Sequence, residues 1–282
     1  MSLSLEPRIP TSGAIAFIGG GHMARSLIGG LRARGQDAAA IHVSEPHAPL
    51  RAALAGDFAV SVHENNYAAA AAAPIWVFAT KPDVLRAVCQ DLAGLAQANR
   101  PLIVSIAAGI TTTQLDRWLG GGLAVVRAMP NTPALLGAGA TGLYANAQAS
   151  PDQRRQAEAI MRAIGWSVWI DDEAGMDAVT AMSGSGPAYV FLLAEAMTAA
   201  GCRQGLPEET ARALSVQTVF GAARMLNEAG EAAAALRQRV TTPGGTTQAA
   251  IEVLEAGGFL GLVDQAIAAA TRRGRELSTA ND

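Results

Sequence analysis

The chain has 282 residues, of which 50% are hydrophobic and 16% are charged, and its formal net charge is −3 at pH 7. Disordered chains combine low hydrophobicity with high net charge, so this composition predicts a folded protein of roughly two domains. The slightly acidic balance offers no polycationic surface, and we therefore expect no nucleic-acid partner.

Short apolar runs alternate with segments of helical spacing through the first half of the chain. The apolar runs predict buried strands at 14–18, 41–44, 59–62, 75–79, 102–106 and 124–127, with later strand residues at Tyr144 and 168–170. The segments between them predict helices at 23–34, 50–55, 83–95, 113–119 and 152–164. Strand and helix alternating at this pace predict an α/β fold with a parallel sheet covered on both faces.

After Asp171 the pattern becomes helical throughout. Prolines and glycines separate predicted helices at 174–200, 207–227, 231–240, 245–255 and 259–277. We therefore predict an α/β domain over 1–171 and an all-helical domain over 172–282. Residues 188–200 carry apolar side chains on more than one helical face, which is typical of a helix buried by more than its own small domain. This pattern predicts self-association through the helical half.

The residues that most often carry metal or covalent chemistry are scarce. Cys89 and Cys202 form no C-x-x-C pair, which argues against a disulfide framework and a thiolate zinc site. All four histidines lie in the first quarter and none forms an H-x-x-x-H pair, so we expect no metal site. Lys81 is the only lysine. A mechanism that requires a lysine base must use that residue.

The mean hydropathy of +0.21 raises the question of a membrane segment. A spanning helix needs about 20 continuous apolar residues. The longest stretch without charged side chains, 128–150, is broken by two prolines, Asn131 and several glycines. Residues 1–12 contain Glu6 and two prolines and lack the apolar core of a signal peptide. We expect a cytoplasmic protein with no membrane partner.

The first predicted strand ends in the sequence Gly-Gly-Gly-His-Met-Ala, a G-x-G-x-x-A motif over residues 19–24 that opens a helix. Gly19 permits a tight turn, Gly21 allows a pyrophosphate to approach the backbone, and Ala24 permits close packing of helix on strand. The helix N-terminus favours an anion. The motif predicts a Rossmann-type dinucleotide site, and a merely structural turn is the alternative.

Glu45 lies just after Ser44, at the end of the second predicted strand. A carboxylate in this place holds the adenosine ribose and favours NAD, because it repels the 2′-phosphate of NADP. The alternative is a solvated loop glutamate whose charge is offset by Arg51. The choice between NAD(H) and NADP(H) stays open.

Further candidate loops follow other strands, where ligands bind in open α/β sheets. Lys81, before a proline at a strand end, is either a cofactor-side residue or an ordinary surface lysine. Asn131 and Thr132 lie between two prolines, which suits either a nicotinamide carboxamide or a structural turn. In the helical half, 183–189 and 241–247 combine glycines with hydroxyl residues, which suits a carboxylate or simple helix capping.

The sequence carries a series of motifs in this order: FIGGGHMA, ATKP, VSIAAGI, RAMPNTPALLGAGATGLYAN, DAVTAMSGSGPAYVFLLAEAM and RVTTPGGTTQAAIEVLEAGGF. From about Ile15 to Leu277 this series resembles the pyrroline-5-carboxylate reductase family, and the last three motifs are the most specific. The resemblance implies an NAD(P)H-dependent oxidoreductase that reduces 1-pyrroline-5-carboxylate to L-proline, the last step of proline biosynthesis. It also implies a Rossmann domain followed by an all-helical domain that forms an intertwined homodimer, often within a decamer of five dimers.

The resemblance, together with the loops above, assigns the expected site residues. The expected cofactor-binding residues are Gly19, Gly20, Gly21, His22, Met23, Ala24, Ser44, Glu45, Asn66, Ala79, Thr80, Lys81, Pro82, Ile106, Ala107, Ala108 and Asn131. The expected substrate-binding residues are Ser183, Gly245, Thr246 and Thr247. We expect Thr247 to be catalytic, with its hydroxyl facing the ring nitrogen. Many members of the family have a small or neutral polar residue where this chain has Glu45, so the usual NADPH preference does not follow.

Two other functions fit part of the pattern. β-Hydroxyacid dehydrogenases share the glycine fingerprint and a helical C-terminal domain, but they use a lysine on a helix in the middle of the chain, whereas Lys81 lies at a strand end. A non-catalytic dinucleotide-sensing dimer is the third possibility. The intact substrate loops argue against it.

Overall fold

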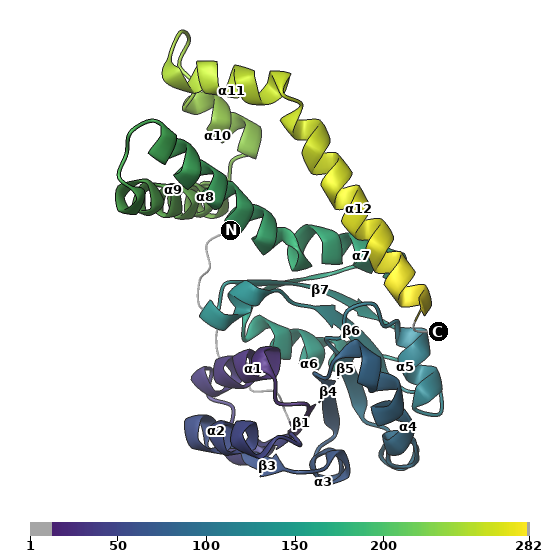
Figure 1. Cartoon of the computed structure of the whole chain (residues 1–282). Helices are drawn as coiled ribbons and strands as arrows, with labels where there is room; N and C mark the ends of the chain where they lie inside the picture. The colour runs from purple at the N-terminus through teal and green to yellow at the C-terminus, as the bar shows by residue number, and fades with distance from the viewer. Residues whose placement is uncertain (1–12, 281–282) are drawn as a thin grey trace. The chain divides into compact units, whose positions relative to one another are not determined.

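The computed structural model describes residues 13–280, which divide into two compact units (Figure 1). The α/β unit comprises 13–185 together with 269–280, and the helical unit comprises 186–268. The division by contacts thus falls after Ser185, whereas the sequence pattern places the change near Asp171. The residues between these two points, and the end of the last helix, lie with the α/β unit.

The α/β unit is built on one sheet in the order β3-β2-β1-β4-β5-β6-β7-β8. Its strands are β1 (Ile15–Ile18), β2 (Ile41–Ser44), β3 (Ser61–His63), β4 (Ile75–Phe78), β5 (Leu102–Ser105), β6 (Val125–Met129), β7 (Gly139–Ala145) and β8 (Gly165–Trp169). Every neighbouring pair is parallel except β6 with β7. The carboxyl ends of β1, β2, β4, β5 and β6 therefore share one edge of the sheet.

Strand β7 pairs with both β6 and β8, and these two pairings determine where β8 ends and the chain leaves the sheet. Leu143 pairs with Ala128 of β6 on one side and with Trp169 of β8 on the other. Since Trp169 ends β8, this strand stops level with Ala128, close to the carboxyl edge of β6. Because β7 and β8 run opposite to β6, β8 begins beyond this edge, and the chain leaves β8 while it is still close to the cofactor loops.

Helices cover both faces of the sheet, as Figure 1 shows. One face buries a cluster with α1 (His22–Ala33), α2 (Ala48–Phe58) and α6 (Pro151–Arg162). The other face buries a second cluster with α3 (Asn66–Ala71), α4 (Pro82–Asn99) and α5 (Thr112–Trp118). Short 3₁₀ helices lie at Ala38–Ala40, Thr132–Leu136 and Glu173–Gly175. The predicted Rossmann-type sheet between two helical layers is confirmed.

The antiparallel pairing of β6 with β7 departs from the predicted parallel sheet. The structure also differs from the predicted elements in other places. The alanine-rich helix α3 was not predicted, and the strand predicted at 59–62 is shifted to Ser61–His63. The helix predicted over 174–200 is divided into the 3₁₀ turn Glu173–Gly175, α7 (Met176–Val179), a π-helix (Thr180–Gly184) and α8. The glycines and hydroxyl residues that follow Met182 disfavour a continuous α-helix, which explains the division.

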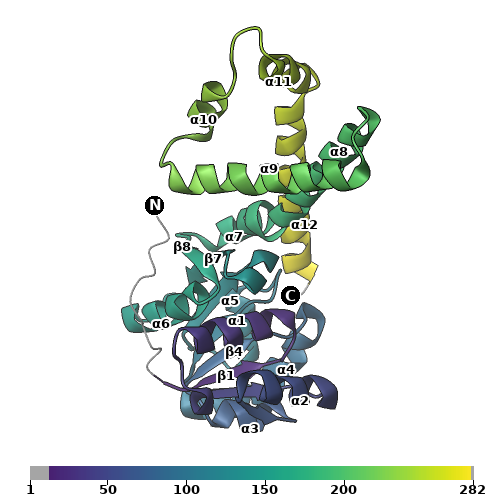
Figure 2. The same ribbon diagram turned by 90° about the vertical axis from the view of Figure 1, so that its left-hand side faces the viewer.

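The helical unit consists of α8 (Gly186–Arg203), α9 (Glu208–Glu228), α10 (Ala233–Arg239), α11 (Thr246–Ala256) and the first part of α12 (Phe259–Ala280). Helix α9 packs across α8, as Figure 2 shows. No residue of α8 is buried, and large apolar side chains such as Phe191, Phe220 and Val253 are more than half exposed. Apolar surface on this scale marks a protein–protein interface.

Within residues 13–280, no single helix is long and apolar enough to cross a bilayer. The pair α11 and α12, which is bent by 51°, reaches the required length and composition only when the two helices are taken together.

Candidate functional site

The turn between β1 and α1 consists of three glycines with different surroundings. Gly19 has φ +103°, and a Cβ there would lie 2.8 Å from the Ala79 carbonyl oxygen. A Cβ on Gly20 would lie 2.6 Å from Leu54 Cδ1. By contrast, nothing lies within 4 Å of a Cβ built on Gly21. The first two glycines let the turn pack against its neighbours, and the third leaves the backbone open to a ligand.

The helix that follows this turn presents its N-terminus at the same place. Gly21 is the N-cap of α1 in an extended conformation, and no acidic residue occupies the first turn. The first N–H groups of a helix have no intrahelical acceptor, and their dipole favours an anion. Ala24 is completely buried where α1 packs on the sheet. These features suit a pyrophosphate group.

The Glu45 side chain is buried and hydrogen-bonded to the glycine turn, so Glu45 is not a solvated loop residue. Its carboxylate accepts hydrogen bonds from the Gly20 N–H to Oε2 at 3.0 Å and from the His47 N–H to Oε1 at 2.9 Å. Arg51 donates to the backbone carbonyl of Glu45, at 2.7 Å, and not to the carboxylate. The side chain is therefore buried beside the turn, where the ribose of a dinucleotide would bind.

Ser44 and Asn66 join the ends of β2 and β3 beside Glu45. The Ser44 hydroxyl donates to Asn66 Oδ1 at 2.7 Å. A pocket of about 310 Å³ opens next to Asn66, lined by Pro46, Glu64, Asn65, Asn66, Tyr67, Asp91 and Leu92. Two of the three residues assigned to the adenosine side, Ser44 and Asn66, are thus joined directly, and Glu45 follows Ser44 in the chain.

The half-buried rings of His42, on β2, and His63, on the neighbouring strand β3, contact each other. His42 Nδ1 and His63 Nε2 are 3.3 Å apart. Burial, and to a lesser extent the charge of His63, lowers the pKa of His42 from its ordinary value of 6.5. The pair is therefore poorly disposed to carry two protons.

The loops after β4 and β5 lie side by side with the end of β1. The Ala79 N–H donates to the Ile18 carbonyl at 2.8 Å, and the Ile106 N–H donates to the Phe78 carbonyl at 3.1 Å. Beside Gly19, the buried Thr80 hydroxyl has no hydrogen-bond partner among the residues that the structure describes. A buried hydroxyl in this state calls for a partner, which a bound ligand or a water molecule would supply. The orphan hydroxyl, the open Gly21 and the braced Glu45 together fit a bound dinucleotide.

Lys81 and Asn131 take different positions. Lys81 is exposed and is the N-cap of α4, immediately after Thr80. Asn131 is buried, and its side chain is already engaged: Oδ1 accepts from the Ala140 N–H at 2.9 Å and Nδ2 donates to the Ser183 carbonyl at 3.0 Å. Asn131 therefore ties the start of β7 to the π-helix that contains Ser183. Single π-turns of this kind are frequent at functional sites.

The expected substrate residues are divided between the two units. Ser183 belongs to the α/β unit, and its hydroxyl donates to the Val179 carbonyl at 2.9 Å. In the helical unit, Gly245 is the N-cap of α11, Thr246 is exposed and Thr247 is half-buried. The Gly244 N–H donates to Gln248 Oε1 at 2.7 Å, which shapes the loop before the helix.

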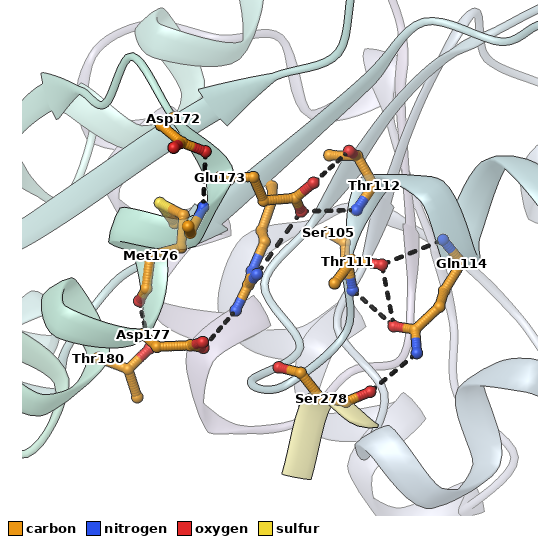
Figure 3. Close-up of polar contacts among 12 residues, drawn as sticks. Ser105, Thr111, Thr112, Gln114, Asp172, Glu173, Met176, Asp177, Thr180 and Ser278 are labelled. Carbon is orange, nitrogen blue, oxygen red and sulfur yellow. Dashed lines mark hydrogen bonds and ion pairs between the residues drawn. The ribbon is translucent and has the colours of Figure 1, made fainter. Parts of the chain in front are cut away.

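A buried ionic network near the β5 loop was not found by sequence reasoning (Figure 3). Arg127, on β6, lies 3.5 Å from Glu173 and 3.4 Å from Asp177. Glu173 also accepts hydrogen bonds from the N–H and hydroxyl of Thr112, both at 2.7 Å. An arginine inside an otherwise apolar strand was the available signal, because a buried guanidinium requires acidic partners.

Metal chemistry finds no support in this part of the chain. Within residues 13–280, no three His, Cys, Asp or Glu side chains are grouped so that they could hold an ion. Burial raises the pKa of the Cys89 thiol to about 12, so that thiol is inert near neutral pH.

Two family models match the chain. Residues 14–109 match the NADP oxidoreductase family described as coenzyme F420-dependent, and residues 173–277 match the pyrroline-5-carboxylate reductase dimerisation domain. The chain is 55% identical to a pyrroline-5-carboxylate reductase of Pseudomonas aeruginosa, over 94% of this chain and 96% of the relative. Its identity to the Escherichia coli enzyme of that name is 38%, over 94% and 98% of the two chains.

Solved structures agree along the whole length. A pyrroline-5-carboxylate reductase of Coxiella burnetii superposes with a TM-score of 0.91 at 43% identity, covering 95% of this chain and 99% of that one. A pyrroline carboxylate reductase of Plasmodium falciparum, solved with NADP bound, superposes with a TM-score of 0.83 at 26% identity, covering 96% and 100%. The resemblance read from the motifs is confirmed, and the chain belongs to the pyrroline-5-carboxylate reductase family.

Proposed function

We propose that this protein reduces 1-pyrroline-5-carboxylate to L-proline with NADH or NADPH, the last step of proline biosynthesis. The observation that carries the proposal is the 55% identity, along nearly the entire chain, to a relative of that name. The glycine turn, Glu45 and the orphan Thr80 hydroxyl would supply the dinucleotide site that this reaction requires.

Residues at the carboxyl edge of the sheet would hold the cofactor. The backbone at Gly21 and the first turn of α1 would bind the pyrophosphate, and Ser44, Glu45 and Asn66 would face the adenosine side. The loops 79–82 and 106–108 would line the remainder of the site. When bound, the cofactor supplies the hydride.

The reaction asks little of acidic or basic side chains. A cyclic imine is basic enough to be protonated near neutral pH, and its iminium carbon accepts hydride directly. The protein must therefore orient the imine, hold its carboxylate and exclude water, and such positioning lowers a barrier by several kcal/mol. No lysine base is required, which agrees with a chain whose only lysine, Lys81, caps a helix at the surface.

The helical unit would contribute the substrate contacts. The backbone N–H groups of Thr246 and Thr247 open α11 and would suit a carboxylate, whereas the N–H of the N-cap Gly245 already donates to the Thr242 carbonyl at 3.0 Å. The half-buried Thr247 hydroxyl would face the ring nitrogen as a hydrogen-bond partner or proton relay. Ser183 would contribute from the π-helix of the α/β unit.

We propose further that two chains form an intertwined homodimer through the dimerisation domain, that five dimers assemble into a decamer, and that the enzyme works in the cytoplasm. Exposed apolar side chains along α8 and α9 support the dimer. We also propose that the chain has two domains, at 1–171 and 172–282. The dimerisation family model, whose match begins at residue 173, supports this boundary.

One assay separates the candidate functions. Purified protein is given L-proline at alkaline pH with NAD⁺ or NADP⁺, and reduction of the dinucleotide is followed by absorbance. Turnover with proline supports the proposal. Turnover with a β-hydroxyacid but not with proline would favour the dehydrogenase alternative, and cofactor binding without any turnover would favour a sensing dimer.

A further inference from the structure

The loop between β5 and α5, residues 106–111, is anchored in part by Ala107 and Ile110, which are buried in the core cluster on this face of the sheet. It begins where the Ile106 N–H donates to the Phe78 carbonyl. It then turns at Gly109, whose φ of +70° lies in the left-handed region. Ile106, Ala107 and Ala108 in this loop are among the residues that we assign to the cofactor. Their position depends on these contacts and on what holds the far end of the loop, at the start of α5.

Glu173 holds that end at two points (Figure 3). Thr112 is the first residue of α5 and directly follows the loop. Its N–H donates to Glu173 Oε1 and its hydroxyl donates to Glu173 Oε2, each at 2.7 Å. Hydrogen bonds to a carboxylate are short and about twice as strong as neutral ones. Two of them, made to one residue, fix both the position and the orientation of the Thr112 peptide.

Arg127 in turn fixes the Glu173 carboxylate. Its guanidinium lies between Glu173 and Asp177, with distances of 3.5 Å and 3.4 Å, and its side chain is 4% exposed. Rotating Glu173 away from Thr112 would leave a buried cation with only one acidic partner, which is costly. These contacts hold Glu173 in the rotamer that faces Thr112.

The last turn of α12 holds the same loop from another side. A Cβ added to Gly109 would lie 3.2 Å from Leu277 Cβ, so backbone and side chain are in close contact. Gln114, in the first turn of α5, donates from Nε2 to the Ser278 carbonyl at 2.9 Å. Both contacts are made within the α/β unit. Glu173 and the end of α12 therefore enclose the loop.

We propose that Glu173 is a positioning residue for the cofactor loop 106–111, acting through Thr112, with Leu277 and Ser278 completing the support. The proposal rests on the dinucleotide site of the proposed function. Glu173 is also the first residue matched by the dimerisation family model. The loop that lines the cofactor would then be held by residues from the dimerisation part of the sequence and not by the Rossmann part alone.

The test compares Glu173→Ala and Thr112→Val with the control Asp172→Asn. Asp172 is an acid beside Glu173, but it bonds only its own turn, through the Ala174 N–H at 3.0 Å, and asparagine retains that acceptor. The Kd for NADH is measured by fluorescence titration without substrate. We expect Glu173→Ala to weaken NADH binding about tenfold, as the loss of hydrogen bonds to a charged group does. Thr112→Val should weaken it by a smaller factor, and Asp172→Asn should leave it unchanged.

Two further measurements distinguish positioning from stability. Glu173→Gln retains an oxygen for the Thr112 N–H and should recover much of the affinity, and the KM for the imine at saturating NADH should stay within about twofold throughout. The double variant should bind no more weakly than Glu173→Ala, because the two residues act as one unit. If Thr112→Val, which leaves the ionic network intact, and Glu173→Ala both lower the Tm but bind NADH like the wild type, the proposal is overturned.

Failure of the proposed function gives a different result. A wild type that binds NADH but does not oxidise proline would overturn the assigned reaction and leave the positioning of the cofactor loop supported by the same titrations. A wild type that oxidises proline, with variants that bind NADH equally well, would overturn the positioning alone.

Discussion

The Gly20 N–H donates a hydrogen bond to the Glu45 carboxylate at 3.0 Å, which ties the glycine turn to the end of β2. This bond leaves the Glu45 carboxylate with remaining acceptor capacity on each oxygen. Those lone pairs would accept hydrogen bonds from ribose hydroxyls. The same carboxylate would face a 2′-phosphate with like charge.

We expect Glu45→Ser to shift cofactor preference toward NADPH. Two charges 4 Å apart repel by about 4 kcal/mol at an effective dielectric of 20. The hydrogen bonds that the Glu45 carboxylate accepts from the Gly20 and His47 N–H groups weaken this repulsion. The NADPH-to-NADH ratio of kcat/KM should rise roughly tenfold, which corresponds to about 1.4 kcal/mol. Steady-state titrations of both cofactors measure it.

Arg51→Ala provides the comparison, because Arg51 bonds the Glu45 backbone and not its carboxylate. That variant should change the ratio less than Glu45→Ser does. An unchanged ratio in Glu45→Ser would contradict the assignment of Glu45 to the ribose.

Thr247→Ala should reduce turnover and leave cofactor affinity nearly unchanged. Thr247 belongs to the helical unit, whereas every residue that we assign to the dinucleotide belongs to the α/β unit. Loss of one hydrogen bond to a charged group costs about 1.5–3 kcal/mol, or roughly 10- to 150-fold in rate. The control is Thr241→Ala, whose hydroxyl is engaged with the Arg237 carbonyl. Equal losses of NADH affinity and kcat in Thr247→Ala would refute its placement.

The protein should be a dimer or a larger assembly at micromolar concentration, with no stable folded monomer. A helical segment of about 110 residues is too small to bury apolar residues on several faces. We expect Phe191→Asp, in α8, to abolish assembly, because it places a charge in an apolar interface. Leu136→Asp alters an apolar residue of the α/β unit that is even more exposed than Phe191, and this variant should still dimerise. Light scattering that finds a folded wild-type monomer would disprove this prediction.

Stability should fall as the pH drops through and below 6.5. Burial and the charge of His63 lower the pKa of His42, so in this range the unfolded chain binds more protons than the native one. We expect the Tm to decrease between pH 7.5 and 5.5, and the decrease to be smaller by roughly one to a few degrees in His42→Gln. Circular dichroism measures both. The same decrease in wild type and variant would show that His42 does not contribute.

The sequence predicted the strands best where apolar residues run continuously. Residues 75–79 contain a run that can only be buried, and the observed strand is Ile75–Phe78. The helix at Asn66–Ala71 was missed because its alanines show no apolar periodicity. The antiparallel direction of β7 could not be predicted from the sequence, because the residues of a strand do not specify its direction in the sheet. The first half of β7 was also missed, because Gly139 and Gly142 interrupt the apolar pattern typical of a strand.

In the candidate site, too, some features follow from the local sequence and others depend on the fold. The glycine turn and Glu45 follow from local spacing, and the structure places them in contact. Glu173 could not be predicted to meet Thr112, because the two lie 61 residues apart and are brought together only by the pairing of β7 with β6 and β8. Asn131 was assigned from its turn, but the structure adds that its amide already bonds Ala140 and Ser183.

The double pairing of Leu143 limits how the family can vary in length. Because Leu143 fixes Trp169 level with Ala128, only the residues 170–172 separate the end of β8 from Glu173. One residue more or fewer in this link would move Glu173 away from Thr112. It would also rotate α7, so that the Ser183 carbonyl would no longer accept a hydrogen bond from the Asn131 side-chain amide. Insertions and deletions that separate related enzymes should therefore avoid 170–183 and accumulate in surface loops such as 229–232, where no such register has to be kept.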